Sequence, residues 1–218
     1  NILSTLTTKI MGTMLKNGSS IEECVTTIAK TLPVCQIRQV AYSTFSVLQV
    51  YKNGEALLLE YDNPGGILIR DGHHENIPFI VKEIEGKIIR EYHFNVQYGD
   101  YYIMISDGVI HAGVGTRNSF GWSRADVVEY VEELCSEDIS SSRLMSLISN
   151  HCNELYDGKP GDDTTVCTVK LRRRNPMNLM IGPPSDPKDV QKMMSLFFSK
   201  EGKHIVCGGT TSSIAAKF

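Results

Sequence analysis

Two acidic segments of this 218-residue chain carry the residue types best suited to chemistry. Asp107 follows the apolar run Tyr101–Ser106 and precedes a glycine, and Asp162 lies in Gly-Asp-Asp-Thr-Thr-Val, at the start of a second β-prone run. An acidic residue placed where such a run meets a glycine is presented at the edge of a sheet. Mg²⁺ and Mn²⁺ take oxygen ligands and keep several waters, so a few Asp residues from separated strands are enough to hold one ion. The two segments therefore predict a shared divalent-metal site.

The chemistry that such a site would support is the hydrolysis of a phosphate monoester. This reaction needs a nucleophile stronger than neutral water and a way to spread the charge on the phosphoryl oxygens, and two divalent ions a few ångströms apart supply both. Clustered carboxylates raise one another's pKa, so a neutralising cation best explains their clustering. Taken singly, Asp107 could be a turn residue and Asp162 an Asx-turn acceptor. Their order, with a helix pair between them, favours the metal site.

The two motifs resemble those of the PPM (type 2C) metal-dependent serine/threonine phosphatases, in the branch named after stage II sporulation protein E. Ser-Asp-Gly-Val after a strand, the helix pair that follows it and the Gly-Asp-Asp-Thr-Thr-Val strand carry this resemblance, together with the turn Tyr61–Gly66 before Ile67–Arg70. The similarity covers about residues 1–172. The family's first metal motif, an Asp-Gly before the first helix, has no counterpart, since the chain opens directly on Asn1.

This resemblance implies a site, cofactors and a substrate. Asp107 and Asp162 would be the catalytic metal ligands, Asp163 a supporting or alternate ligand, and Gly108 would leave room beside the metal. Two Mn²⁺ or Mg²⁺ ions are expected in the complete protein. The substrate would be phosphoserine or phosphothreonine on a phosphoprotein, such as an anti-anti-sigma-type regulator in bacterial signalling.

The missing first motif leaves an alternative open. We expect the present chain to bind at most one ion weakly and to be nearly inactive, because it lacks the carboxylate that would bridge two ions. The alternative function is that of a catalytically impaired, phosphatase-like module that acts by binding or regulating a partner. An Asp-Gly motif in the natural sequence before Asn1 would favour the enzyme.

Three further segments are weaker candidates. His111 could be a general acid for the leaving alkoxide, against a plain surface role. His73 and His74 could suggest a zinc or general-base role, but adjacent residues cannot easily face one ion, so we expect a solvated hairpin loop. A candidate anion site between a strand and a helix, for which an ordinary turn is the simpler explanation, consists of Gly208, Gly209 and Thr210.

Residue periodicity predicts helices and strands in separate blocks, which is typical of an α+β fold. Helical patterns cover 2–15, the stretch from Ser19-Ser20 to about Leu32, 124–134 and 140–156, with Ser19-Ser20 supplying one N-cap and Ser123 another. Strand patterns, including a hairpin at Asn53-Gly54, cover 44–51, 56–61, 67–70, 77–84, 87–96, 101–106 and 164–171. The resemblance refines this to a PPM-like α/β/β/α sandwich of two antiparallel sheets flanked by helices, with a C-terminal βα appendage.

A change in composition after Arg172-Arg173-Arg174 predicts two parts. The first is a PPM-type phosphatase domain over residues 1–174, and the second is an appended βαβα segment over 175–218, complete or truncated. In that segment, strands at 178–181 and 204–207 should pair in parallel across a helix at 186–199.

Composition restricts the partners. A formal charge of −3 and 41% hydrophobic residues are ordinary for a globular protein and give no sign of a nucleic-acid surface. Six cysteines without a Cys-x-x-Cys pair favour reduced core thiols over disulfides. The sequence has no run of about twenty apolar residues and no signal peptide, so we expect no membrane span and a cytoplasmic location.

Overall fold

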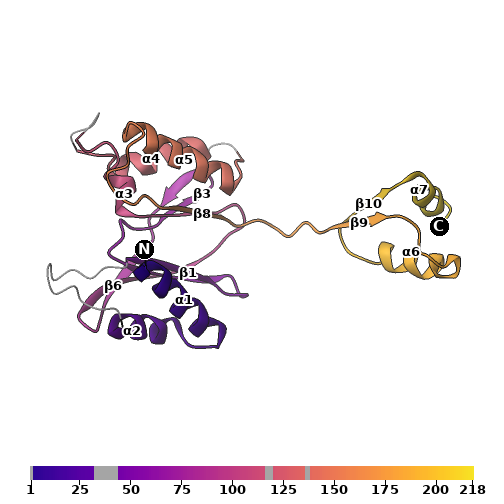
Figure 1. Ribbon diagram of the computed structural model, residues 1–218, viewed down its shortest axis with the longest axis horizontal. Helices are drawn as coiled ribbons and strands as arrows, with labels where there is room; N and C mark the ends of the chain where they lie inside the picture. Colours follow the sequence, from indigo (N-terminus) through magenta and orange to yellow (C-terminus); the bar gives the residue numbers. More distant parts are fainter. Residues whose placement is uncertain (1, 32–43, 116–119, 136–137) are drawn as a thin grey trace. The chain divides into compact units, whose positions relative to one another are not determined.

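The computed structural model describes residues 2–31, 44–115, 120–135 and 138–218 (Figure 1). The chain divides into two compact units, Asn1–Arg172 and Arg173–Phe218. None of the described helices is long and apolar enough to cross a membrane.

The first unit is built on two four-stranded antiparallel sheets. The first sheet has the order β1-β2-β6-β5 and the second the order β4-β3-β7-β8. Their strands are β1 (Phe45–Val50), β2 (Glu55–Tyr61), β3 (Ile67–Arg70), β4 (His73–Glu75), β5 (Phe79–Ile84), β6 (Lys87–Asn95), β7 (Tyr101–Ile105) and β8 (Val166–Lys170).

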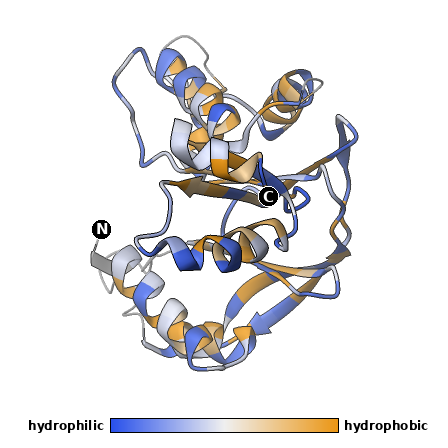
Figure 2. Ribbon diagram, turned by 90° about the vertical axis from the view of Figure 1, so that its right-hand side faces the viewer, coloured by the Kyte–Doolittle hydropathy of each residue, from blue (hydrophilic) through white to orange (hydrophobic). Residues whose placement is uncertain are grey.

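Two pairs of helices cover the outer faces of these sheets (Figure 1). The helices α1 (Ile2–Lys16) and α2 (Ile21–Thr31) pack on the first sheet, and α4 (Arg124–Cys135) and α5 (Ser141–Leu155) pack on the second. Figure 2 shows that these helices carry hydrophobic and hydrophilic residues in stripes, as expected for helices with one buried face. The predicted α/β/β/α sandwich is therefore confirmed.

Each helix pair closes a separate hydrophobic core. The core between the first pair and the first sheet contains Met11, Ile21, Cys24, Val25, Ile28, Leu59 and Ile89. The core under the second pair includes Ile69, Ile103, Trp122, Val127, Val131, Leu144 and Ile148. The metal-site segments adjoin the second core, since Val109, which follows the Ser-Asp-Gly sequence, is fully buried in it.

The helix starts agree with the predicted caps. Ser20 and Glu23 form a reciprocal capping box, in which the Glu23 amide donates to Ser20 Oγ at 3.1 Å and the Ser20 amide donates to Glu23 Oε2 at 2.8 Å. Ser123 and Asp126 form the same box at the start of α4. The predicted end of the second helix, near Leu32, lies outside the described residues.

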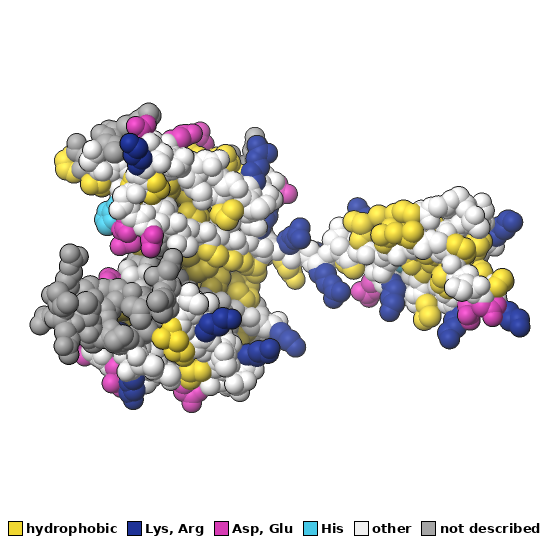
Figure 3. Space-filling model, in the orientation of Figure 1, with side chains coloured by type: hydrophobic (Ala, Val, Ile, Leu, Met, Phe, Trp, Pro, Cys, Tyr) yellow, Lys and Arg dark blue, Asp and Glu magenta, His cyan; other side chains and the backbone are white. Residues whose placement is uncertain are grey.

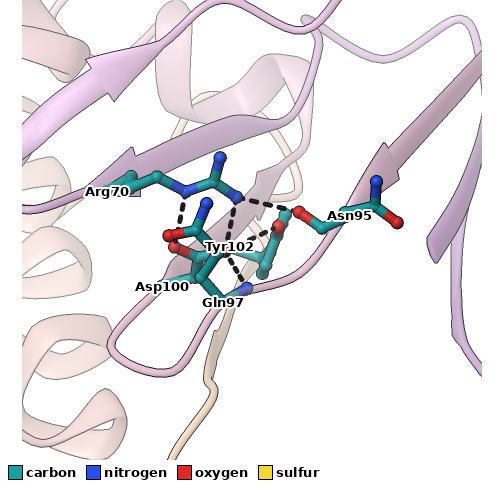
Figure 4. A network of polar contacts seen from close by, with 5 residues as sticks. All are labelled: Arg70, Asn95, Gln97, Asp100 and Tyr102. Atoms are coloured by element: carbon teal, nitrogen blue, oxygen red, sulfur yellow. Dashed lines mark hydrogen bonds and ion pairs between the residues drawn. The ribbon is translucent and has the colours of Figure 1, made fainter. Parts of the chain in front are cut away.

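A buried polar network joins the two sheets (Figure 4). Arg70 on β3 donates from Nε and Nη2 to the two carboxylate oxygens of Asp100, at 3.0 and 2.9 Å, and from Nη2 to the carbonyl of Asn95 on β6 at 2.9 Å. The Gln97 amide and the Tyr102 hydroxyl also donate to Asp100 Oδ2. Because Asp100 is 1% exposed and fully paired, this network fixes the β6–β7 connection.

Two short elements of the first unit differ from the sequence prediction. The pair His73-His74, expected in a loop, belongs to β4, which pairs with β3. The prediction was wrong because a strand of three residues gives no alternating pattern long enough to recognise. Asp107, for which a simple turn was the alternative to a metal ligand, begins the single-turn helix α3 (Asp107–Ile110), which was not predicted.

The expectation that the cysteines are core thiols holds for only part of the set. Cys24, Cys135 and Cys152 are buried, whereas Cys167 and Cys207 are exposed, and Cys35 lies outside the described residues. All five described cysteines are free thiols. An exposed thiol lies on the solvent face of a strand, and an apolar run alone does not show which of its residues face outward.

The second unit contains a parallel strand pair, as the sequence predicted. β9 (Met177–Ile181) pairs in parallel with β10 (Lys203–Cys207), and the crossover holds the 3₁₀ turn Pro187–Asp189 and α6 (Val190–Phe198). Asp186 caps this crossover by accepting from the Lys188 amide at 2.9 Å. The helix α7 (Gly209–Ala215) follows β10.

Candidate metal site

The strand register brings the two acidic segments together. β7 and β8 are antiparallel neighbours in which Ile105 pairs with Val166, so the end of β7 and the start of β8 meet at the same edge of the second sheet. Asp107 begins α3 two residues after β7 ends, and Asp162 lies four residues before β8 begins. Segments that are more than fifty residues apart in sequence are therefore neighbours in space.

Three side chains gather at this edge with the donor types of a metal site. One carboxylate oxygen of Asp107, one of Asp162 and a ring nitrogen of His111 all lie within 4.8 Å of one another, and all three residues are accessible to solvent. Figure 3 shows acidic side chains beside a histidine on this face of the first unit. His111 reaches the cluster because it lies four residues after Asp107, one helical turn further along α3.

The two segments are held together by hydrogen bonds of the amide and the hydroxyl of Ser106. The Ser106 amide donates to the Thr165 carbonyl at 3.0 Å, and the Thr165 amide donates back to Ser106 Oγ at 2.9 Å. Ser106 Oγ in turn donates to the Asp163 carbonyl at 3.1 Å. These bonds hold the start of α3 against the loop before β8. The positions of both carboxylates therefore depend on this one contact between the two segments.

Gly108 lies in the contact between these two segments. A Cβ atom added to it would lie 2.6 Å from the Asp163 carbonyl oxygen and 2.9 Å from Thr164 Oγ1. Its own carbonyl accepts from the buried Tyr156 hydroxyl at 2.7 Å. Burial raises the pKa of Tyr156, and the nearby carboxylates of Asp162 and Asp107 add to the rise, so this hydroxyl remains a donor at neutral pH.

The two carboxylates open into a cleft of about 740 Å³ between the sheets. Hydroxyl groups line much of it; they belong to Ser4, Thr7, Thr8, Thr44, Ser46, Ser106, Thr164 and Thr165. Among the described residues of the lining there is no lysine or arginine. Among the described lining residues, the charged groups that a phosphate would meet are carboxylates, and a bound cation would balance the charge of both.

Solved structures with this architecture are known. The phosphatase domain of the cell fate determinant SpoIIE from Bacillus subtilis is 18% identical over 80% of this chain and 75% of that chain, with a TM-score of 0.56. The SiaA-PP2C domain of Pseudomonas aeruginosa is 12% identical over 78% of this chain and 68% of that chain, with a TM-score of 0.58. The chain has the PP2C phosphatase fold.

A third match to the PP2C fold comes from a two-domain structure. The RsbU and RsbW domains of a Mycobacterium tuberculosis protein are 14% identical over 89% of this chain and 54% of that chain, with a TM-score of 0.59. No family model matches the sequence, and no curated protein does either. At these identities the likeness establishes the PP2C fold, and the chemistry has to be argued from the site.

Not all of the site residues predicted from the sequence lie together in the structure. Asp107 and Asp162 lie in the cluster, whereas the Asp163 side chain does not belong to it. The space left by Gly108 is filled by the backbone of Asp163. The carbonyl of Gly108 already accepts hydrogen bonds from the hydroxyls of Tyr156 and Thr164. A role for Gly108 in holding a metal therefore stays a prediction.

For His111 the sequence left a general-acid role open beside a plain surface role, and its place in the cluster adds a candidate ligand role that was not foreseen. The spacing of four residues between Asp107 and His111 was the available signal, but it is informative only once that turn is known to be helical. The other candidate, an anion site, lies at the start of α7 in the second unit and stays a prediction; its residues are Gly208, with φ of 98°, Gly209 and Thr210.

Proposed function

We propose that this chain is the phosphatase domain of a metal-dependent enzyme that hydrolyses phosphoserine or phosphothreonine in a protein. The observation that carries the proposal is the group of two carboxylates and one imidazole at the mouth of a hydroxyl-lined cleft, whose described lining residues include no lysine or arginine. The PP2C fold supports the same class of reaction.

The donor set fits a hard divalent cation. Asp107 and Asp162 supply the oxygen ligands that Mn²⁺ and Mg²⁺ prefer, and His111 supplies a nitrogen that Mn²⁺ accepts more readily than Mg²⁺ does. When bound, such ions lower the pKa of water to give a nucleophile near neutral pH and balance the charge of the phosphoryl group. A second ion, as proposed for the complete enzyme, needs carboxylates besides these.

The chain's own residues would perform the remaining tasks. Asp107 and Asp162 hold the cation at the end of the cleft, while the hydroxyls of Ser106 and Thr164 keep the two acidic segments in register. The cleft is open to solvent, so a phosphorylated side chain on a protein surface can enter it. We propose a regulatory phosphoprotein of the anti-anti-sigma type as substrate, because the similar structures include SpoIIE and an RsbU domain.

Hydrolysis of p-nitrophenyl phosphate by the full-length protein tests this function. Activity should need added Mn²⁺ or Mg²⁺, and Asp107→Asn or Asp162→Asn should lower turnover by orders of magnitude while the circular dichroism spectrum is kept. Asp71→Asn, in the exposed turn between β3 and β4, is the matched control and should retain activity. Undiminished hydrolysis in excess EDTA would refute the assignment.

Two substrates with different leaving groups can distinguish a metal-ligand role of His111 from a general-acid role. A metal ligand at this position predicts that His111→Ala weakens Mn²⁺ binding and slows all substrates alike. A general acid predicts a larger loss for an alkyl phosphate than for p-nitrophenyl phosphate, because nitrophenolate leaves without protonation. Titration calorimetry with Mn²⁺ and the ratio of the two rates distinguish these roles.

A second candidate function is a partner-binding module with little activity. It is favoured by one observation: within the described residues, potential ligands form a single group of three, enough for one ion and not for a bridged pair. This function predicts that full-length protein binds one Mn²⁺ ion at most and that Asp162→Asn leaves its binding to a partner unchanged. Two tightly bound ions per chain would exclude it.

A further inference from the structure

A second cavity, of about 260 Å³, lies on the other side of the loop that forms one wall of the cleft. This loop joins β2 to β3: Asn63 lines the cleft, whereas Pro64 and Gly65 line the second cavity. The cleft is bordered by residues near the edge strands β1 and β8, and the second cavity by residues of the opposite edge strands, β4 and β5. The loop between β2 and β3 therefore contributes residues to both.

Two arginines face this cavity from different elements. Arg90 lies on β6 and Arg124 begins α4, and both guanidinium groups approach Gly65, at 3.6 and 3.5 Å from where its Cβ would be. Arg124 donates from Nη2 to the Gly66 carbonyl at 2.9 Å. Arg90 donates from Nη2 to the Asn63 carbonyl. The guanidinium groups are therefore fixed by backbone acceptors of the loop, and each has further N–H donors to offer.

The two positive charges are not equally balanced. Arg90 lies 3.8 Å from Oε2 of Glu60, which is 1% exposed. Arg124 has no carboxylate within ion-pairing distance in the described part of the chain, although it is half-buried. Glu75 is exposed at the rim. A half-buried guanidinium without an anionic partner is an unfavourable arrangement that an incoming anion would relieve.

The rest of the lining suits the same kind of ligand. Burial raises the pKa of Tyr92 to about 12, helped by the Glu60 carboxylate with which its hydroxyl interacts, so Tyr92 adds no negative charge to the cavity at neutral pH. Burial and Arg124 lower the pKa of His74, which leaves this ring neutral at pH 7. Phe79 lies beside Arg90, with the guanidinium carbon 5.9 Å from its ring centre, and forms an apolar wall. An apolar wall beside cationic donors matches a carboxylate on a short aliphatic stem.

We propose that this cavity binds an acidic side chain, best a glutamate, of the phosphoprotein substrate, close to the residue whose phosphate enters the cleft. Binding of the acidic side chain needs no catalysis. The link to a phosphorylated residue in the cleft rests on the proposed function. A substrate segment that crosses the loop between β2 and β3 would place its phosphate on one side and its glutamate on the other. The enzyme would then select acidic sequences although the described residues that line its cleft include no lysine or arginine.

The test uses pairs of phosphoserine peptides that differ only by Glu or Gln, with this residue moved through successive positions on each side of the phosphoserine. At one position kcat/KM for the Glu peptide should exceed that for the Gln peptide by about tenfold, the size expected for one charge-assisted pair. The ratio within one protein cancels any general loss of activity in a variant.

Two variants with opposite expected effects make the test specific. Arg124→Gln should reduce the Glu/Gln ratio to about one, and Glu75→Gln, which removes the negative charge at the rim, should raise it above the wild-type value. Arg143→Gln, the same change on the exposed surface of α5, is the matched control and should keep the wild-type ratio. A ratio near one at every position in the wild type, or one that Arg124→Gln leaves intact, overturns the proposal.

Failure of the proposed function would give a different result. If no peptide is hydrolysed, titration calorimetry with the unphosphorylated Glu and Gln peptides measures the cavity alone. The Glu peptide should then bind about tenfold more tightly to the wild type and equally weakly to Arg124→Gln. Equal affinity of both peptides for the wild type overturns the proposal without reference to activity.

Discussion

Adding one methyl group at Gly108 should disrupt the metal site more than it disrupts the fold. In Gly108→Ala the new Cβ would lie 2.6 Å from the Asp163 carbonyl oxygen, whereas ordinary contact begins at 3.4 Å, so the two segments must part by about 0.8 Å. That carbonyl is backbone, held by Ser106 Oγ at 3.1 Å, and cannot turn aside as a flexible side chain would. The displacement falls on the loop that carries Asp162.

The expected magnitudes follow from this displacement. Overpacking of this kind costs about 1–3 kcal/mol of unfolding free energy. A misplacement of nearly 1 Å at a catalytic centre costs about a hundredfold in rate. Mn²⁺ affinity should fall as well, because the donor atoms of Asp107 and Asp162 now lie within 4.8 Å and would be drawn apart.

Gly12→Ala is the matched control for this prediction. Gly12 is exposed in α1, and nothing lies within 4 Å of its added Cβ, so the same methyl group should stabilise the helix by about 0.5–1 kcal/mol. Both variants are compared by thermal unfolding, Mn²⁺ titration and hydrolysis of p-nitrophenyl phosphate. If Gly108→Ala keeps its Mn²⁺ affinity and turnover within about twofold of the wild type, the two segments are not joined as tightly as these distances indicate.

Three further predictions concern stability, thiols and domain organisation. Asp100→Asn should cost about 3–5 kcal/mol in urea unfolding, because it leaves the largely buried Arg70 guanidinium without its carboxylate; a loss below about 1 kcal/mol would contradict the network in Figure 4. Burial raises the pKa of Cys152 to about 11, so at pH 8 it should react with a disulfide reagent far more slowly than exposed Cys167 and accelerate only as the pH approaches 11; equal rates at pH 8 would contradict its burial. Removing residues 173–218 should leave metal-dependent hydrolysis of p-nitrophenyl phosphate largely intact, because the first unit has its own cores; a folded but inactive deletion variant would place this segment in the active site.

The sequence was most informative where an element is long enough to repeat its pattern. The strand β2 and its hairpin partner β1 were recognised from alternation and from Asn53-Gly54, and α4 from its capping residue Ser123. The elements that were missed, β4 and α3, have three and four residues, so neither completes enough of its period to be distinguished from a turn.

The same limit applies to the sites. Asp107 and Asp162 could be paired as candidates because each lies where a β-prone run meets a glycine and because the two motifs together resemble the phosphatase pattern; their role as ligands stays a prediction. The second cavity could not be predicted, since Arg90 and Arg124 come from a strand and a helix whose contact depends on how the two sheets face each other. Such pairs are set by tertiary packing, which leaves no local signal in the chain.

The pairing of Ser106 with Thr165 also determines when the proposed metal site can form. These residues are fifty-nine positions apart, and the chain between them contains α3, α4 and α5. Closing so long a loop is slow relative to local contacts, because its conformational entropy is lost before the pairing compensates for it. During synthesis the carboxylates of Asp107 and Asp162 would therefore meet only after β8 has emerged and joined β7. A nascent or truncated chain that ends before β8 would carry Asp107 without a metal site, and tight Mn²⁺ binding would mark a first unit that has completed its second sheet.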